Sequence, residues 1–456
     1  MSAVLEAPAS RAARLKRVPG LRMMWIIRQL RRGNFTHAVK NSYTVPDAFD
    51  SYFGPFRVIF IHHPDLVEAL LVKNHKSYHK DSGYAALRRV LGNGLLTNEG
   101  EHHLRQRRMI QPAFHKKRID TYAQCMVQYA RDRAARWQDG QQLDFHAEMM
   151  YVTLRVIAKT MFNADVADKA ERVAHALDVI FSVQDRYTIE WIGKIFDALP
   201  LQSTRDLHRC LRELDEIIYG FIREHREAQE DAGDLLSMLL DAQSEDDGSR
   251  MNDQQLRDEC LTLFLAGHET TAVALSWTFY LLSQHPEVEA RLHEELDRVL
   301  AGRDATADDV ARLPYTRQVL TESMRLYPPA FAVGRMAIED NDLCGHKIRK
   351  GDTIIVSQYI THRQPEWFPD PERFDPERWA PGGPATDLPK FAYFPFGGGA
   401  RKCIGDQFAW MEGILLLATF AQQWQARLAP GHTVSSDPGI TLRPRNGMPM
   451  ILRQRK

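Results

Sequence analysis

The sequence has few cysteines, no long apolar run and no net charge, and each absence excludes a class of protein. Its five cysteines, at positions 125, 210, 260, 344 and 403, are odd in number, far apart and never paired as Cys-x-x-Cys, which favours a reducing compartment over a disulfide framework. No run of about 18 apolar residues is present to span a bilayer. Lys and Arg total 59, as do Asp and Glu, so nucleic-acid binding is not expected. We expect a cytoplasmic protein without a transmembrane anchor.

What is present is an ordinary globular composition, with 44% hydrophobic and 26% charged residues. Residues 1–35 form a basic leader, in which eight Lys and Arg residues precede position 33 against one acid, Glu6. Such a leader is typical of a targeting peptide, a helix in peripheral contact with a membrane surface, or a solvated arm. No long linker interrupts residues 36–456, which we expect to form a single domain.

The patterning predicts a mainly α fold with small β-sheets. Aromatic and β-branched residues around a Gly-Pro turn predict a hairpin over 52–61, and Pro64 begins a helix. Residues 99–300 have helical periodicity, and one candidate helix, 252–284, is apolar nearly all round and must therefore be buried. Short strands, Pro-rich loops and a last helix over 404–424 follow residue 340.

The densest chemical signal is the segment 394–408, where three glycines precede Cys403 at the start of the last helix. Gly397, Gly398 and Gly399 allow close backbone approach to the sulfur, and the positive end of the helix stabilises a thiolate. Gly405 keeps side-chain bulk away, so that a flat ligand can lie against the turn. The alternative is a structural cysteine beside a flexible loop.

Phe396, Gly399, Arg401, Cys403 and Gly405 match the pattern F-x-x-G-x-R-x-C-x-G. In this segment the sequence resembles the cytochrome P-450, or heme-thiolate monooxygenase, superfamily. The resemblance implies the cytochrome P-450 fold, with heme b between the long central helix and the cysteine loop and last helix. It also implies that the Cys403 thiolate binds the iron and that dioxygen is the co-substrate.

Two further motifs follow the family's order. Glu322 and Arg325, three residues apart, share one helix face and are similar to its E-x-x-R. The resemblance implies a buried network with an arginine of the segment 371–379, where the spacing from Phe374 and Pro376 favours Arg378, while Arg373 is expected to be solvated.

The stretch from Ala266 to Thr271 resembles the family's [AG]-G-x-[DE]-T-T and lies midway along the long helix. Ala266 and Gly267 leave room for a ligand, and a threonine hydroxyl can bond the carbonyl one turn back. The resemblance assigns Glu269 and Thr270 to delivery of protons to bound oxygen. The alternative is a helix bend with two satisfied polar side chains.

A cofactor with carboxylates needs cations nearby. His103 and Arg107 lie one helical turn apart on one face. The resemblance implies that these two, with Arg335 and Arg401, bind the heme propionates, although many relatives have Trp at the position of His103.

The constellation predicts insertion of one oxygen atom into a C–H bond or alkene of an apolar molecule, by hydroxylation or epoxidation. Lipids, terpenoids and similar secondary metabolites fit such a pocket. We expect a monomer that receives electrons from a separate ferredoxin or flavodoxin-like donor and its reductase. A positive patch for such a donor would comprise Lys402, Arg105, Arg107, Arg108, Lys116, Lys117 and Arg118.

The resemblance places substrate contacts in four mostly aliphatic segments and a lid in residues 181–201. The candidate pocket residues are Tyr84, Leu96, Leu263, Ala330, Val333 and Ile440.

Three other functions remain open at this point. A heme-thiolate isomerase or dehydratase would keep the cofactor without consuming dioxygen. A heme sensor or carrier would need no Thr270. A hydrolase would use Cys403 as nucleophile with His362 or His268 as base, but no spacing of a triad supports it.

Overall fold

The computed structural model describes residues 15–32, 47–164, 176, 179–180, 201–228, 233–244 and 248–455. The chain divides into two compact units. Unit 1 comprises residues 1–81, 332–371 and 388–402, and unit 2 comprises residues 82–331, 372–387 and 403–456. Residues 181–200 of the predicted lid lie outside the described residues. The separation of a leader, 1–35, from a catalytic domain, 36–456, stays a prediction.

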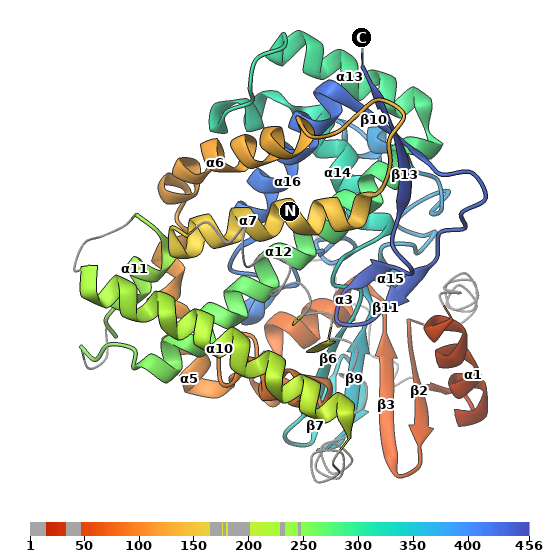
Figure 1. Cartoon of the computed structure of the whole chain (residues 1–456). Coiled ribbons are helices and arrows are strands. Elements are labelled where there is room, and N and C mark those ends of the chain that lie inside the picture. Colours follow the sequence, from red (N-terminus) through yellow and green to blue (C-terminus); the bar gives the residue numbers. More distant parts are fainter. Residues whose placement is uncertain are drawn as a thin grey trace, which may run out of the picture. The chain divides into compact units, whose positions relative to one another are not determined.

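Unit 1 is built on a six-stranded sheet of order β1-β2-β3-β9-β6-β4, in which β1–β2 and β3–β9 are parallel pairs and the other pairs are antiparallel (Figure 1). A separate hairpin pairs β7 with β8. The elements of unit 1 are β1 (Lys16–Arg17), α1 (Gly20–Arg31), β2 (Ala48–Phe53), β3 (Phe56–Ile61), α3 (Pro64–Glu68), the π-helical turn η1 (Ala69–Lys73), η2 (His75–Ser77), β4 (Tyr78–Lys80), β6 (Val333–Ala337), β7 (Asn341–Leu343), β8 (His346–Ile348), β9 (Thr353–Val356), α15 (Gln358–Thr361) and η7 (Gly399–Arg401).

The core of unit 1 forms where the central strands pack against the chain that follows β3. Ile59, Ile354 and Val356 belong to one buried cluster with Leu70 of η1 and Phe394 of the glycine-rich segment. The hairpin predicted over 52–61 is present, and its first strand begins earlier, at Ala48. The glycine-rich segment is therefore fixed at its start by the packing of this core.

Unit 2 contains most of the helices, as the sequence predicted for a mainly α fold (Figure 1). Its elements are α4 (Gly83–Leu91), α5 (Gly100–Ile110), η3 (Gln111–Phe114), α6 (Lys116–Ala134), β5 (Gln142–Asp144), α7 (Phe145–Phe162), α10 (Gln202–Ala228), α11 (Leu235–Asp241), α12 (Asp253–Gln284), α13 (Pro286–Leu300), η5 (Ala307–Arg312), α14 (Pro314–Leu326), η6 (Pro376–Trp379), α16 (Asp406–Gln423), β10 (Trp424–Leu428), β11 (Ser436–Pro438), β12 (Leu442–Pro444) and β13 (Pro449–Gln454).

Helix α12 is the long helix that the sequence predicted, and it runs through the centre of unit 2. Asn252 caps its start by accepting a hydrogen bond from the Gln255 amide, and Pro286 begins the next helix just beyond its end. At 1.5 Å per residue its 32 residues span about 48 Å. The helix packs against α7, α10, α14 and α16, which explains why its sequence is apolar nearly all round.

Candidate active site

The glycine-rich segment of unit 1 holds a backbone path that other residues cannot follow. Gly399 has a φ of +65°, and a Cβ atom there would lie 1.9 Å from the Leu71 carbonyl oxygen. The Phe394 amide donates to Nε2 of His362 at 3.0 Å, so this buried histidine is committed to the segment. Glycine at 399 is required by both conformation and close approach, which explains part of the motif without a ligand.

Cys403 opens the part of the motif that belongs to unit 2. It is exposed, is not part of a disulfide, and lies three residues before α16 begins at Asp406. Burial lowers the pKa of the half-buried Arg107, and the neighbouring Cys403 and Asp406 act in the opposite direction. A Cβ atom at Gly405 would make only an ordinary 3.6 Å contact with Phe114. Packing within the chain therefore does not require glycine there, and the space beside the thiol suits a flat group.

The middle of α12 has an open face on an otherwise buried helix. From Leu256 to Phe279 every residue is buried except Ala266, Gly267 and Thr270. Positions i, i+1 and i+4 lie on one side of a helix, so these three residues form a single window. The Thr270 hydroxyl donates to the Ala266 carbonyl oxygen at 2.8 Å, as predicted for a bond one turn back. A helix that is sealed elsewhere and open here can accommodate a ligand at this point.

Gly267 has a second role that the sequence did not reveal. A Cβ atom at this position would approach Cδ1 of Ile157 in α7 to 2.7 Å. The glycine thus lets α7 pack closely on α12, and the direction in which its side chain would project is filled by Ile157 rather than left open. Room beside the window comes from the absence of a larger side chain at Ala266.

Glu269, next to Thr270, is buried and turned toward the C-terminal part of the chain. Its Oε1 accepts hydrogen bonds from Nε of Arg443 at 2.6 Å and from the Thr441 hydroxyl. The Arg443 side chain is 21% exposed, so the pair extends from the core to solvent. Neither partner was predicted, because they lie about 170 residues further along the chain.

The two histidines near this pair are neutral. Burial lowers the pKa of His146 to about 4 and that of His268 to about 3, and the positive charge of Arg443 acts in the same direction on both. His146 is hydrogen-bonded to the Ser276 hydroxyl at 3.0 Å, and His268 lies against the ring of Phe264. Neither arrangement supports a base for a cysteine hydrolase.

Glu322 forms the network expected of the E-x-x-R motif. Arg325 donates to both of its carboxylate oxygens at 2.8 Å, from Nε and Nη2, and Nε of Arg378 lies 3.3 Å from Oε1. The Asp375 amide and the Trp379 indole also donate to this carboxylate. Arg378 is buried here, whereas the Arg373 side chain is exposed and only its carbonyl oxygen is used, by Arg325.

The four cationic residues predicted to bind propionates are divided between the units. His103 is buried and Arg107 half-buried on α5 of unit 2. Arg335 lies in β6, and Arg401 in η7, both half-buried in unit 1. The predicted pocket residues are divided as well. Val333 lies in unit 1, and the unit 2 residues are Tyr84, Leu96, Leu263, Ala330 and Ile440.

The segment 92–97 is clamped to the first half of α12. The amides of Asn93 and Leu95 donate to the carboxylates of Asp258 and Glu259 at 2.7 and 2.9 Å. A Cβ atom on Gly92 would lie 2.2 Å from the Asp258 carboxylate oxygens. Because the contacts are made by backbone, this segment, which contains the predicted pocket residue Leu96, is held in one position. The signal in the sequence that could have predicted this contact is the pair of acidic residues, Asp258 and Glu259, in an otherwise apolar helix, together with the Gly-Asn-Gly turn at 92–94.

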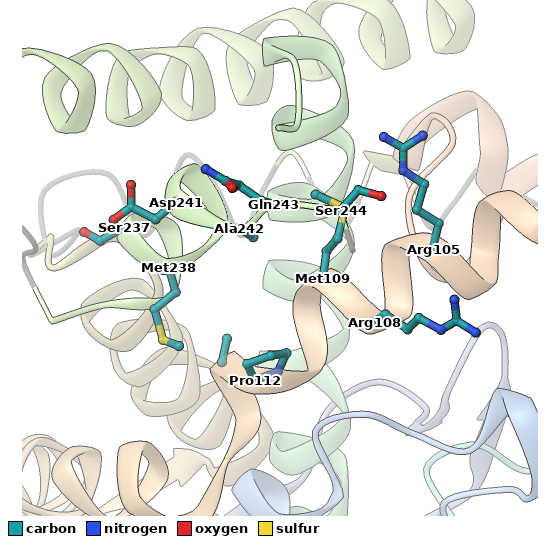
Figure 2. A pocket seen from close by; sticks show the side chains of 11 residues that line it. Arg105, Arg108, Met109, Pro112, Ser237, Met238, Asp241, Ala242, Gln243 and Ser244 are labelled. Carbon is teal, nitrogen blue, oxygen red and sulfur yellow. The ribbon is translucent and has the colours of Figure 1, made fainter. Parts of the chain in front are cut away.

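A cavity of about 310 Å³ lies elsewhere in unit 2, between α5, η3 and α11 (Figure 2). Arg105 and Arg108 of α5 line one side of it, and Asp241 and Gln243, at and beyond the end of α11, line the other side (Figure 2). Arg105 also donates to the Ser249 hydroxyl. The cavity shares no residue with the window on α12. It is lined by Arg105 and Arg108, two of the arginines that were predicted to face an electron donor.

Comparison with known proteins gives a consistent result along nearly the whole chain. The family model described as Cytochrome P450 matches residues 17–449. Cyclooctatin synthase of Streptomyces melanosporofaciens is 38% identical over 401 residues, which cover 87% of this chain and 86% of the relative. The cyclooctat-9-en-7-ol 5-monooxygenase of the same organism is 39% identical over 389 residues, with coverages of 85% and 84%. Pentalenene oxygenase of Streptomyces avermitilis is 36% identical over 378 residues, with 83% of each chain covered.

Solved structures agree. The cytochrome P450DA heme domain superposes with a TM-score of 0.85 at 26% identity, covering 97% of this chain and 98% of that one. The retinoic acid bound cyanobacterial CYP120A1 gives a TM-score of 0.81 at 27% identity, covering 91% and 93%.

Proposed function

The chain belongs to the cytochrome P450 family of heme-thiolate monooxygenases, and on this premise we propose that Cys403 is the residue that binds the heme iron. Enzymes of this family insert one atom of dioxygen into a hydrophobic substrate. The observation that carries the assignment is the exposed Cys403 thiol beside Arg107 and the α16 N-terminus. Heme, when bound, supplies the iron at which dioxygen is reduced, and its thiolate ligand promotes cleavage of the O–O bond.

We propose that Arg107 and His103 bind one side of the cofactor, and that Arg335 and Arg401 supply the remaining cationic contacts. A carboxylate taken out of water needs charged or hydrogen-bonding partners, and guanidinium groups provide them in a planar fork. The partial burial of Arg107 supports this role in binding a carboxylate, because a half-buried cation is stabilised when an anion binds next to it. Phe396, Gly399 and Gly405 shape the loop around the cofactor.

Thr270 and Glu269 divide the handling of protons between them. Thr270 lies in the open window, where its hydroxyl donates to the Ala266 carbonyl oxygen and keeps a lone pair that can accept a hydrogen bond from water. Glu269 accepts from Arg443, which reaches solvent, so the carboxylate is a link between the bulk and the window. Because Glu269 and Thr270 are consecutive residues of α12, the helix fixes the position of one side chain relative to the other.

We propose an apolar, polycyclic terpenoid as substrate. The relatives named above include a cyclooctat-9-en-7-ol 5-monooxygenase and a pentalenene oxygenase, and family members of this kind oxygenate terpenoids. The candidate contacts support the same class, because Leu96, Leu263, Ala330, Val333 and Ile440 are all aliphatic. Such side chains bind hydrocarbon by excluding water and leave orientation to shape.

The electron donor we propose is a ferredoxin or a flavodoxin-like protein with its reductase. The candidate patch is smaller than the sequence indicated, because Arg105 is bonded to Ser249 and Arg118 to the Gly233 carbonyl oxygen. Lys117 and Lys402 are exposed, and Lys116 is exposed with Asp120 as its partner. Lys116→Glu with Lys117→Glu should slow electron transfer and weaken its dependence on salt. An unchanged rate and salt dependence would exclude this docking face.

Monomeric state and cytoplasmic location stay predictions. No helix among the described residues has both the length and the apolar character needed to cross a membrane.

The decisive experiment replaces Cys403 with serine and compares it with Cys344→Ser, which removes another exposed thiol. We expect the reduced carbon monoxide difference spectrum of the heme-thiolate centre to vanish in the first variant and persist in the second. Product formation from a terpenoid, with matching consumption of dioxygen and donor electrons, then distinguishes a monooxygenase from an isomerase or a carrier. Retention of the wild-type spectrum by Cys403→Ser would refute the assignment.

A further inference from the structure

Exposed large apolar side chains are few among the described residues, and they gather near the start of the chain. Leu21, Met24 and Trp25 of α1 are 78%, 53% and 45% exposed, and Phe56 at the β2–β3 turn is 68% exposed. Tyr52 of β2 and Leu104 of α5 complete the set. Single exposed apolar residues are normal, but three of the six, Leu21, Met24 and Trp25, lie within five residues of one helix, which makes α1 a candidate interaction surface.

The stripe on α1 has a fixed position. Leu21, Met24 and Trp25 are spaced i, i+3 and i+4 and therefore share one side of the helix, while Met23 points into the core. The chain just before the helix is bonded to β2 through the Val18 amide and the Asp50 carbonyl oxygen at 2.8 Å. Residues 18 and 20–25 are thus part of the folded unit rather than a loose extension.

The charge around this stripe has one sign. Residues 7–46 contain no Asp or Glu, and the acid-free stretch includes α1 entirely. On the described part of it, the arginines at 22, 28 and 32 are exposed. A helix with apolar side chains, neighbouring arginines and no acids matches the interface of an anionic bilayer. The acyl chains of the lipids accept the apolar side chains, and the anionic headgroups attract the arginines.

We propose that α1 docks the protein on the surface of an anionic bilayer, with Leu21, Met24 and Trp25 inserted at the headgroup boundary. Three side chains are too few for a stable interface with a second copy of this chain, which takes about 20–30 residues a side. An acidic protein would match the arginines but leave the apolar stripe without a counterpart. The surface shares no residue with the candidate heme site, and the proposal does not rest on the proposed function.

The test is flotation of the purified holoprotein with vesicles of phosphatidylcholine alone or mixed with phosphatidylglycerol. We expect binding to the anionic vesicles that weakens with added salt. Arg22→Gln and Arg28→Gln should each weaken binding about fivefold. Leu21→Ser combined with Met24→Ser and Trp25→Ser should reduce binding at least tenfold. The matched controls are Leu104→Ser and Arg136→Gln, exposed residues of the same types in unit 2.

Three outcomes would overturn the proposal. One is equal binding by the wild type and the triple variant, and another is equal binding to both vesicle types regardless of salt. The third is dimerisation in sedimentation that the triple variant abolishes, which would assign the stripe to a second copy. Thermal unfolding of the triple variant serves as the folding control, because the replaced side chains are exposed and should leave stability nearly unchanged.

Discussion

Two buried glutamates of unit 2 both pair with arginine, yet their surroundings differ. Glu322 is fully buried with Arg325, and it also accepts from the Asp375 amide and the Trp379 indole. Glu269 is equally buried, but its partner Arg443 reaches solvent. The first carboxylate has its acceptor positions filled by fixed groups, which suits a structural role. The second is paired with an arginine whose side chain is partly exposed to solvent, which suits a role in proton transfer.

Glu412 of α16 shows what happens to a buried carboxyl without an arginine. It is fully buried, and burial raises its pKa to about 8, with the Thr271 hydroxyl acting in the opposite direction. At neutral pH it is therefore the protonated acid. Comparison of the three carboxyls shows that burial alone does not define a role, because each is buried among different partners.

The largest effect is expected when the fully buried pair of Glu322 and Arg325 is broken. Arg325→Ala leaves Glu322 buried with its main cation missing and should lower the free energy of unfolding by about 3–5 kcal/mol. Urea unfolding followed by circular dichroism measures it. Arg373→Ala, at an exposed side chain of the same network, should cost less than about 0.5 kcal/mol. Equal losses in the two variants would refute the distinction.

Thr270→Val tests the window beside Glu269. Removal of a positioned hydroxyl should reduce product formation about a hundredfold, the lower end for proton transfer by a positioned group, with little change in stability. Product and donor consumption are measured together. Thr278→Val is the matched control, because Thr278 makes the same bond to Ala274 at 2.7 Å on a buried part of α12. A comparable loss of product in Thr278→Val would remove the special role of the window.

Arg443→Met breaks the pair of Glu269 and the partly exposed Arg443. We expect a loss of about 1–2 kcal/mol, smaller than at Arg325 because water can reach the vacated end and hydrate the carboxylate. Thermal unfolding at pH 7 measures it, with Arg445→Met, whose partner Asp437 is exposed, as control. Adding Glu269→Gln should restore part of the loss. Simple additivity of the two substitutions would show that the pair is not coupled.

The smallest effect concerns the largely buried pair of His225 and Asp234. His225 contacts Asp234 at 2.6 Å and the Phe221 carbonyl oxygen at 2.9 Å, and the hydrogen bond to Asp234 raises its pKa. Since the folded pKa exceeds the ordinary value of about 6.5, the stabilisation is complete below that pH and is lost as pH rises through the folded pKa. His225→Gln should therefore cost about 1 kcal/mol at pH 6 and less at pH 9, by urea unfolding. A cost that is independent of pH would contradict the pairing.

The sequence predicted features whose causes are local. The bounds of α12 follow from an apolar run between a capping asparagine and Pro286, and the structure has the helix at Asp253–Gln284. The preference for Arg378 over Arg373 came from spacing within one short segment, and Arg378 is the one that lies against Glu322. In both cases the deciding residues are within a few positions of each other.

Features made by distant segments could not be predicted. The contact of Arg443 with Glu269 joins residues 174 apart, and no periodicity in either segment records it. The packing of Ile157 against Gly267 likewise depends on how α7 crosses α12. A glycine between polar residues had two physical explanations, ligand room and helix packing, and only the arrangement of the two helices separates them.

The clamp between residues 92–97 and α12 has a practical consequence for engineering. Because Asp258 and Glu259 hold amides rather than side chains, the half-buried side chain at 96 can be exchanged without releasing the main chain. A library randomised at Leu96 would therefore vary the shape of the candidate pocket while the main chain stays in place. Directed evolution toward new oxidation products should begin there and leave Gly92 and Gly94 untouched, since Cβ atoms at these glycines would collide with Asp258 and Thr262.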